Sequence, residues 1–97
     1  GSGPAYVFYL AEAMTAAAVE LGLDLSTATQ MVNQTILGAA TLLDASGESA
    51  TTLRTNVTSP NGTTHAAITA FDALGVASSI GVGMTAARDR SRELSGG

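Results

Sequence analysis

The 97-residue sequence contains no cysteine, no lysine and no tryptophan, and its aromatic residues are only two tyrosines and two phenylalanines. The lack of cysteine excludes disulfides, thiolate nucleophiles and cysteine metal sites. Because alanine is abundant where aromatics are scarce, we expect helices packed closely through small side chains. A chain of this length buries one modest core, so residues 1–97 are expected to form a single domain.

Positive charge is also scarce, since eight acidic residues face four arginines and the formal net charge is −4. Nucleic-acid binding depends on a basic surface, so we exclude that class of partner. The apolar run 5–21 is too short for a typical membrane span and carries Glu12 and Glu20. We therefore expect no membrane segment there, and instead a helix buried on most sides within a protein assembly.

The spacing of apolar residues predicts an all-α fold, with no convincing alternation of period two. Ser2 and Gly3 precede Pro4 at a helix start, and Asp24 can cap a second helix. The five expected helices cover residues 4–21, 26–45, 50–57, 63–74 and 76–94.

Residues 56–64 combine turn-forming residues and side-chain hydroxyls immediately before a new helix. Pro60 fixes one backbone angle, and Asn61 and Gly62 readily enter left-handed conformations, so we expect a sharp turn. The following helix points free N–H groups into the space beside this turn. The pattern therefore predicts an anion-binding site.

Two other patterns resemble ligand sites, but neither predicts one. Gly81, Gly83 and Ala86 match the spacing of a dinucleotide-binding loop, but no strand precedes them, so we expect no cofactor site and instead a close approach of helices. Glu12, Glu20 and Asp24 are candidate metal ligands, and the first two share one face of the first helix, but carboxylates so far apart favour solvated or capping roles. Glu12 has the alternative of pairing with an arginine across a subunit interface.

His65 and the arginines near the end of the chain are interpreted as structural or solvated. His65 is the only histidine and has no carboxylate or cysteine partner nearby in the sequence, which disfavours a role as general acid. Arg88, Arg90 and Arg92 alternate with acidic residues, which is typical of a solvated helix end and not of a phosphate site.

The helix expected at residues 4–21 has apolar side chains in every direction around its axis, since Glu12, Thr15 and Glu20 are its only clearly polar interior positions. Such a helix needs neighbours on all sides. The simplest solution is a five-helix orthogonal or interlocking bundle that forms an intertwined two-fold homodimer. The alternative is that alanine faces, being weakly apolar, remain exposed.

Several motifs occur along the chain in an order that carries a family resemblance. They are Ser2-Gly3-Pro4-Ala5-Tyr6-Val7-Phe8 with Glu12-Ala13, Gly22-Leu23, Leu37-Gly38-Ala39-Ala40, Leu53-Arg54, Val57-Thr58-Ser59-Pro60-Asn61-Gly62-Thr63-Thr64, and Ala86-Ala87 with Arg88 and Arg92-Glu93-Leu94. Together they cover essentially all 97 residues. The sequence resembles the C-terminal helical dimerisation domain of pyrroline-5-carboxylate reductase.

The resemblance implies an oxidoreductase of proline biosynthesis that reduces the C=N bond of 1-pyrroline-5-carboxylate to L-proline. Hydride comes from NADPH or NADH held by an N-terminal dinucleotide-binding domain, so we expect this chain by itself to bind no cofactor and to be inactive. The resemblance further implies a cytoplasmic homodimer, with dimers assembling into larger rings, and a substrate loop drawn from the partner subunit in several members.

When the family's functional residues are placed on the matching positions of this sequence, the resemblance implies that the backbone N–H groups of Gly62, Thr63 and Thr64 bind the substrate carboxylate. The Thr64 hydroxyl approaches the ring nitrogen as the catalytic contact, and Ser59 joins the substrate-binding set chiefly by bracing the turn. Asn61 stands where the family usually has glycine, which bears on the identity of the substrate. Two alternatives stay open: a non-catalytic helical interaction module with the same fold, and a domain of a related imine reductase.

Overall fold

The computed structural model describes residues 3–96, and within this range it contains α-helices and no strand. The helices are α1 (Gly3–Glu20), α2 (Leu25–Ala45), α3 (Ala50–Asn56), α4 (Thr63–Ala73) and α5 (Val76–Leu94). The all-α prediction is confirmed, with helix ends within one residue of those expected from the sequence. Ser2, expected to mark the first helix start, lies outside the described residues.

The helices fall into two compact units, one comprising the residues up to Ala50 and the other the residues from Thr51 onward. We call these the first unit and the second unit. The first contains α1 and α2, and the second contains nearly all of α3 together with α4 and α5. That the chain forms one domain stays a prediction.

The turn from α1 to α2 is closed by a glycine in a left-handed conformation. Gly22 has φ 114°, and its N–H donates to the carbonyl of Val19 at 3.0 Å. The N–H of Leu23 donates to the carbonyl of Ala18 at 3.1 Å. This pair of bonds is the Schellman motif, which satisfies carbonyls left free at the end of a helix.

Asp24 caps the start of α2. Its carboxylate accepts bonds from the Thr27 N–H at 2.8 Å and the Thr27 hydroxyl at 3.1 Å. These bonds stabilise the ionised form, the backbone bond most, and so lower the pKa of Asp24. A negative charge at this position also interacts favourably with the N-terminal end of the helix.

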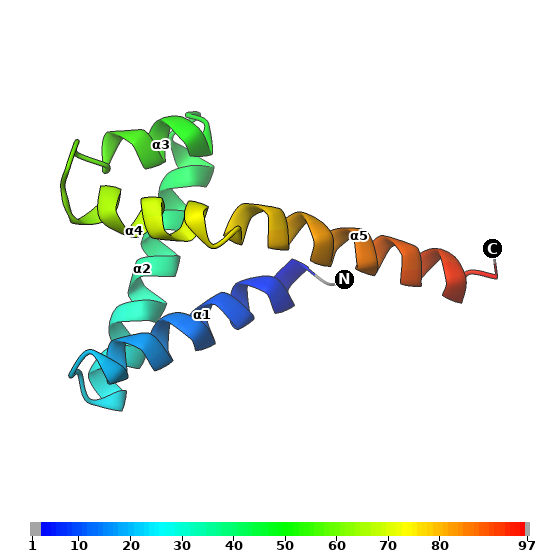
Figure 1. Cartoon of the computed structure of the whole chain (residues 1–97), viewed down its shortest axis with the longest axis horizontal. Helices are drawn as coiled ribbons and strands as arrows, with labels where there is room; N and C mark the ends of the chain where they lie inside the picture. The colour runs from blue at the N-terminus through cyan, green and yellow to red at the C-terminus, as the bar shows by residue number, and fades with distance from the viewer. Residues whose placement is uncertain (1–2, 97) are drawn as a thin grey trace. The chain divides into compact units, whose positions relative to one another are not determined.

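The core of the first unit lies where α1 and α2 meet near their turn. Ala28 is fully buried and Val32 is 6% exposed, and these are the only buried side chains among the described residues. Beyond this contact the two helices diverge (Figure 1). Large apolar side chains consequently stay exposed along both helices, including Phe8 at 66%, Tyr9 at 75% and Leu37 at 59%.

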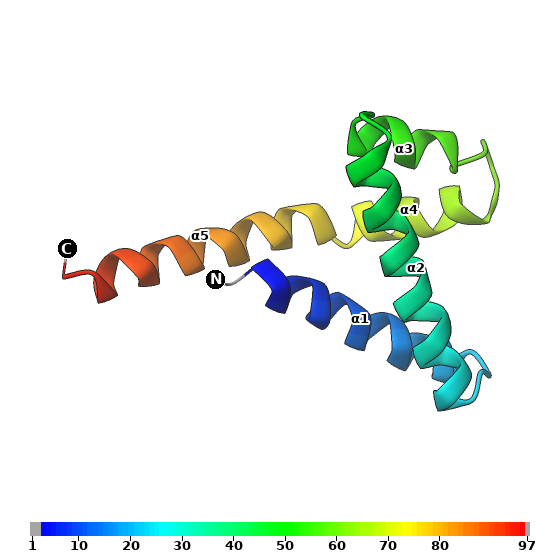
Figure 2. The same ribbon diagram turned by 180° about the vertical axis from the view of Figure 1, so that it is seen from behind.

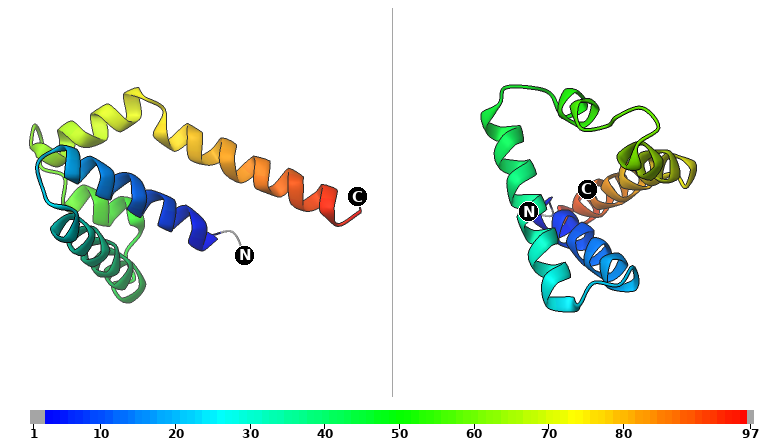
Figure 3. Two further views of the ribbon diagram at one scale, coloured as in Figure 1. Left: turned by 90° about the horizontal axis from the view of Figure 1, so that it is seen from below. Right: turned by 90° about the vertical axis from the view of Figure 1, so that its left-hand side faces the viewer.

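In the second unit, α3 and α4 run in opposite directions and are joined by a loop (Figure 2). Gly75, with φ 72°, separates α4 from α5, and the axes of these two helices are bent by 52° at that break (Figure 3). A left-handed residue ends one helix without preventing the next from starting at once, which is why the glycine is needed there.

Within residues 3–96, no single helix combines the length and the hydropathy that a membrane crossing requires. Only the bent pair of α4 and α5 meets that criterion, and only when both helices are counted together.

Candidate functional site

The loop between α3 and α4, residues 57–62, is held at its first end by bonds to the last turn of α3. The Arg54 carbonyl accepts from the Val57 N–H at 3.2 Å and from the Thr58 hydroxyl at 2.5 Å. The Thr58 N–H donates to the carbonyl of Thr55 at 3.1 Å. Thr58 is half-buried, and these three bonds hold the start of the loop against α3.

The middle of the loop is a tight turn closed by a bond from the Gly62 N–H to the Ser59 carbonyl at 3.0 Å. Pro60 and Asn61 occupy its central positions, and Asn61 has φ 60°, the only positive φ of a non-glycine residue in the described part of the chain. Proline followed by a residue of positive φ is the pattern of a type II turn. The sharp turn predicted from the sequence is confirmed.

Gly62 also sits too close to the turn for a larger residue to fit easily. A Cβ atom added there would lie 3.2 Å from the Ser59 carbonyl oxygen and 3.4 Å from the Ser59 Cβ. The φ of Gly62 is −85°, so the requirement for a small residue is one of space and not of backbone angle.

Gly62 is the N-cap of α4 and provides no side-chain bond to the first turn. The first helical bond in that turn runs from the Ala66 N–H to the Gly62 carbonyl at 3.1 Å. The N–H groups of Thr63, Thr64 and His65 therefore have no helical acceptor. With no acidic residue in the first turn, they present a partial positive charge beside the loop.

The four expected site residues, Ser59, Gly62, Thr63 and Thr64, thus occur together in one turn and the helix start that follows it. One detail differs from the sequence-based assignment, because the Gly62 N–H is engaged by Ser59. The donors left for an anion are those of Thr63, Thr64 and His65. The sequence analysis did not single out the His65 N–H, although counting the first turn of α4 from Gly62 as its cap would have shown that this donor has no helical acceptor.

The side chains at this helix start differ in exposure. Thr64 is half-buried, whereas Thr63, His65 and Asn61 are exposed. Within the described residues no group of three or more His, Asp or Glu side chains is placed to hold a metal ion. The groups at this helix start that can hydrogen-bond a ligand include the free backbone N–H groups and the hydroxyls of Thr63 and Thr64.

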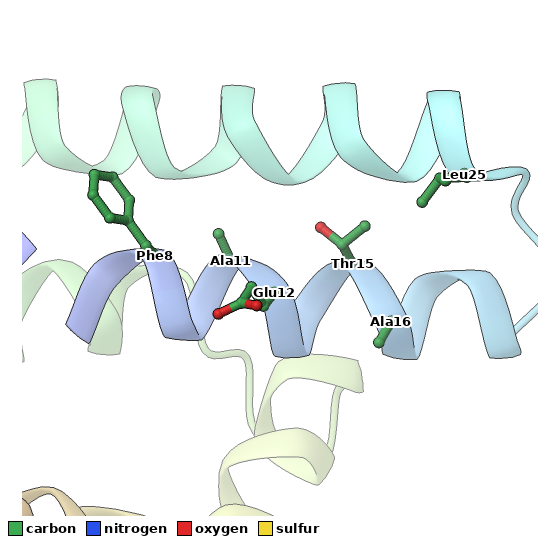
Figure 4. Close-up of a pocket in the computed structure, with 6 residues that line it drawn as sticks. All are labelled: Phe8, Ala11, Glu12, Thr15, Ala16 and Leu25. Atoms are coloured by element: carbon green, nitrogen blue, oxygen red, sulfur yellow. The ribbon is translucent and has the colours of Figure 1, made fainter. Parts of the chain in front are cut away.

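Two open grooves lie away from this loop, in the first unit. One has a volume of about 470 Å³ and is lined by Phe8, Ala11, Glu12, Thr15, Ala16 and Leu25 (Figure 4). The other follows the buried contact of α1 with α2. Neither groove includes a residue of the loop.

A model of the protein family described as pyrroline-5-carboxylate reductase dimerisation matches residues 1–94. The chain belongs to this family. The resemblance read from the motifs is thus confirmed over nearly the whole length.

Individual members of the family agree with this assignment. The chain is 49% identical over 94 residues to the pyrroline-5-carboxylate reductase of Pseudomonas aeruginosa, covering 97% of this chain and 34% of that protein. The solved structure of a pyrroline-5-carboxylate reductase from Coxiella burnetii superposes with a TM-score of 0.92 at 42% identity, covering 97% of this chain and 35% of the other.

A more distant structure, the Plasmodium falciparum pyrroline carboxylate reductase with NADP bound, gives a TM-score of 0.79 at 29% identity. It covers 82% of this chain and 32% of that one. The chain therefore spans about a third of the length of the relatives it matches.

Proposed function

We propose that this chain is the dimerisation and substrate-loop part of a pyrroline-5-carboxylate reductase, which reduces 1-pyrroline-5-carboxylate to L-proline with NAD(P)H. The family match over residues 1–94 carries the proposal, because it includes the loop and helix start described above. The names of the relatives support the activity, and the NADP bound to the Plasmodium falciparum relative supports the cofactor class.

The substrate carboxylate binds at the start of α4 in this proposal. Three N–H groups without helical acceptors, those of Thr63, Thr64 and His65, converge there. Backbone donors at a helix N-terminus bind anions without lysine or arginine, which suits a chain with no lysine. The rigid turn from Ser59 to Gly62 keeps the approach to these donors open, since Gly62 carries no side chain.

Thr64 then lies beside the reacting bond. A nicotinamide cofactor would supply the hydride that adds to the imine carbon, and the pyrroline nitrogen would take a proton from water to become the amine of proline. The half-buried Thr64 hydroxyl hydrogen-bonds that nitrogen and orients it. Because the chain spans about a third of its relatives and one of them has NADP bound, we place the nucleotide site in the remaining part of the enzyme.

A homodimer completes the proposal. The exposed apolar side chains of the first unit require cover, and a second copy of the same chain supplies it in a two-fold arrangement with interlocked helices. We place the enzyme in the cytoplasm, as an enzyme of proline biosynthesis.

The test joins this segment to a nucleotide-binding domain of the family and follows NADPH oxidation with 1-pyrroline-5-carboxylate. Turnover that depends on this imine is expected, and Thr64→Ala should lower kcat/KM by about a hundredfold. Thr69→Ala is the matched control, because the Thr69 hydroxyl donates to the His65 carbonyl at 2.8 Å one turn further along α4.

No turnover from a correctly assembled fusion would contradict the proposal and favour a non-catalytic helical module. Turnover with other cyclic imines but not with this one would favour a related imine reductase. Equal losses in Thr64→Ala and Thr69→Ala would remove Thr64 from the site.

A further inference from the structure

Glu12 lies on the rim of the 470 Å³ groove in the first unit. Phe8, Ala11 and Thr15 point from α1 toward α2, and the Glu12 carboxylate lies beside them in front of α1 (Figure 4). The lining is otherwise apolar or small. Any protein surface that covers this groove must therefore also cover a carboxylate.

No cation within the first unit can neutralise Glu12. Residues 1–50 include five acidic side chains and no lysine, arginine or histidine. A carboxylate that is buried without a partner costs several kcal/mol, so the covering surface needs its own positive charge beside apolar side chains.

One helix of the chain has this combination. On α5 the residues Ile80, Met84, Arg88 and Arg92 are spaced four apart and form one row along the helix surface, of the kind that packs between the rows of another helix. Ile80 is 58% exposed and Met84 is 54% exposed. The row therefore offers apolar contact at one end and positive charge at the other.

Arg92 is the free charge in that row. Arg88 pairs with Asp89 at 3.0 Å, and Arg90, which lies on another row, pairs with Glu93 at 2.9 Å. Within the described residues the Arg92 guanidinium makes no ion pair. It is thus the α5 arginine that can take a new carboxylate partner without giving one up.

We propose that the groove between α1 and α2 docks α5 of a second copy of this chain, with Glu12 of one copy paired to Arg92 of the other. The proposal rests on the proposed homodimer and specifies the register of its interface. In a two-fold dimer the pair occurs twice. Its role is to fix which parts of two apolar surfaces meet, because apolar packing alone discriminates poorly between registers.

Charge reversal tests the pairing on the 97-residue chain by sedimentation equilibrium. Glu12→Arg and Arg92→Glu each place like charges together twice, so each should weaken the dimer at least about tenfold. Glu48→Arg makes the same charge change at an exposed position that is not part of the groove, and it should stay within about twofold of the original dissociation constant.

Mixing the two variant chains decides between pairing across copies and pairing within one chain. In an equimolar mixture of Glu12→Arg and Arg92→Glu chains, the mixed dimer contains two opposite-charge pairs, so its affinity should return to near the original. If the pair formed within a single chain, the double variant would recover but the mixture would not, and that result would overturn the proposal.

Helix content by circular dichroism accompanies each measurement. Variants that lose helix alone and regain it in the mixture support the proposal. The proposal is contradicted if the two variants dimerise as well as Glu48→Arg does. It is also contradicted if neither the mixture nor the double variant restores their dimer affinity. If the unaltered chain is itself a monomer, the proposed homodimer fails, whereas a stable dimer that is indifferent to these charges defeats only the assigned pairing.

Discussion

The first unit and the loop before α4 differ in what their own residues leave unsatisfied. The first unit buries only Ala28 and Val32 and leaves most of its apolar side chains exposed. The loop is held internally by bonds of Thr58 and Gly62, and it leaves backbone donors free at its end. The difference fits the two proposed roles, a protein partner for the apolar surface of the first unit and a small anion for the backbone donors beside the loop.

Breaking the small core of the first unit should give the largest effect. Val32→Asp places a carboxylate without a partner where only 6% of the side chain is exposed. The expected cost is several kcal/mol, with a loss of about 10 °C or more in melting temperature. Thr41→Asp, an exposed position on the same helix, is the control. Equal melting temperatures measured by circular dichroism would show that the contact of α1 with α2 is not the core.

Removing the Thr64 hydroxyl should affect activity, which we assign to the loop, without affecting dimerisation, which we assign to the first unit. In the fused enzyme described above, Thr64→Ala is expected to reduce kcat/KM by about a hundredfold and to leave the dimer dissociation constant unchanged. Both quantities are measured on the same preparation, kcat/KM by steady-state kinetics and the dissociation constant by sedimentation equilibrium. A variant that lost dimerisation together with activity would show that the loop also holds the subunits together.

Substitution of Asn61 should have a smaller effect, confined to the turn. At φ 60° alanine is disfavoured, so Asn61→Ala should destabilise the chain by about 1 kcal/mol, measured by urea unfolding. Asn61→Gly suits that angle and should stay within about 0.5 kcal/mol of the original. If alanine were tolerated as well as glycine, the turn would not require a left-handed residue.

Acid should have the smallest effect, through the cap of α2. The pKa of Asp24 is lowered in the folded state from its ordinary value of 3.8, so its stabilising contribution is present above that value and is lost as pH falls through the folded pKa. Melting temperatures recorded down the acid range should fall less for Asp24→Asn than for the original. If the melting temperatures of Asp24→Asn and of the original fell in parallel with pH, the acid sensitivity would belong to other carboxylates. The cap of α4 would not contribute, because Gly62 has no titratable side chain.

Helix ends were predictable because they depend on neighbouring residues alone. Asp24 caps through Thr27, and Gly22 and Gly75 adopt the left-handed angles that glycine readily takes. The turn at Pro60 and Asn61 was predictable for the same reason. Local signals of this kind act within a few residues, so the sequence carries them directly.

Other features depend on geometry that local patterns do not contain. The engagement of the Gly62 N–H by Ser59 depends on the turn type, which decides whether that donor faces inward or outward. The groove beside Glu12 depends on how α1 and α2 diverge after their contact. The angle at which two helices diverge does not follow from apolar spacing, although the need to cover their apolar side chains does.

Sedimentation equilibrium of the unaltered 97-residue chain tests the central claim, that its exposed apolar surface is a dimer interface. At micromolar concentration the account predicts a species of twice the 9.6 kDa chain mass. A species of 9.6 kDa with full helix content would contradict it.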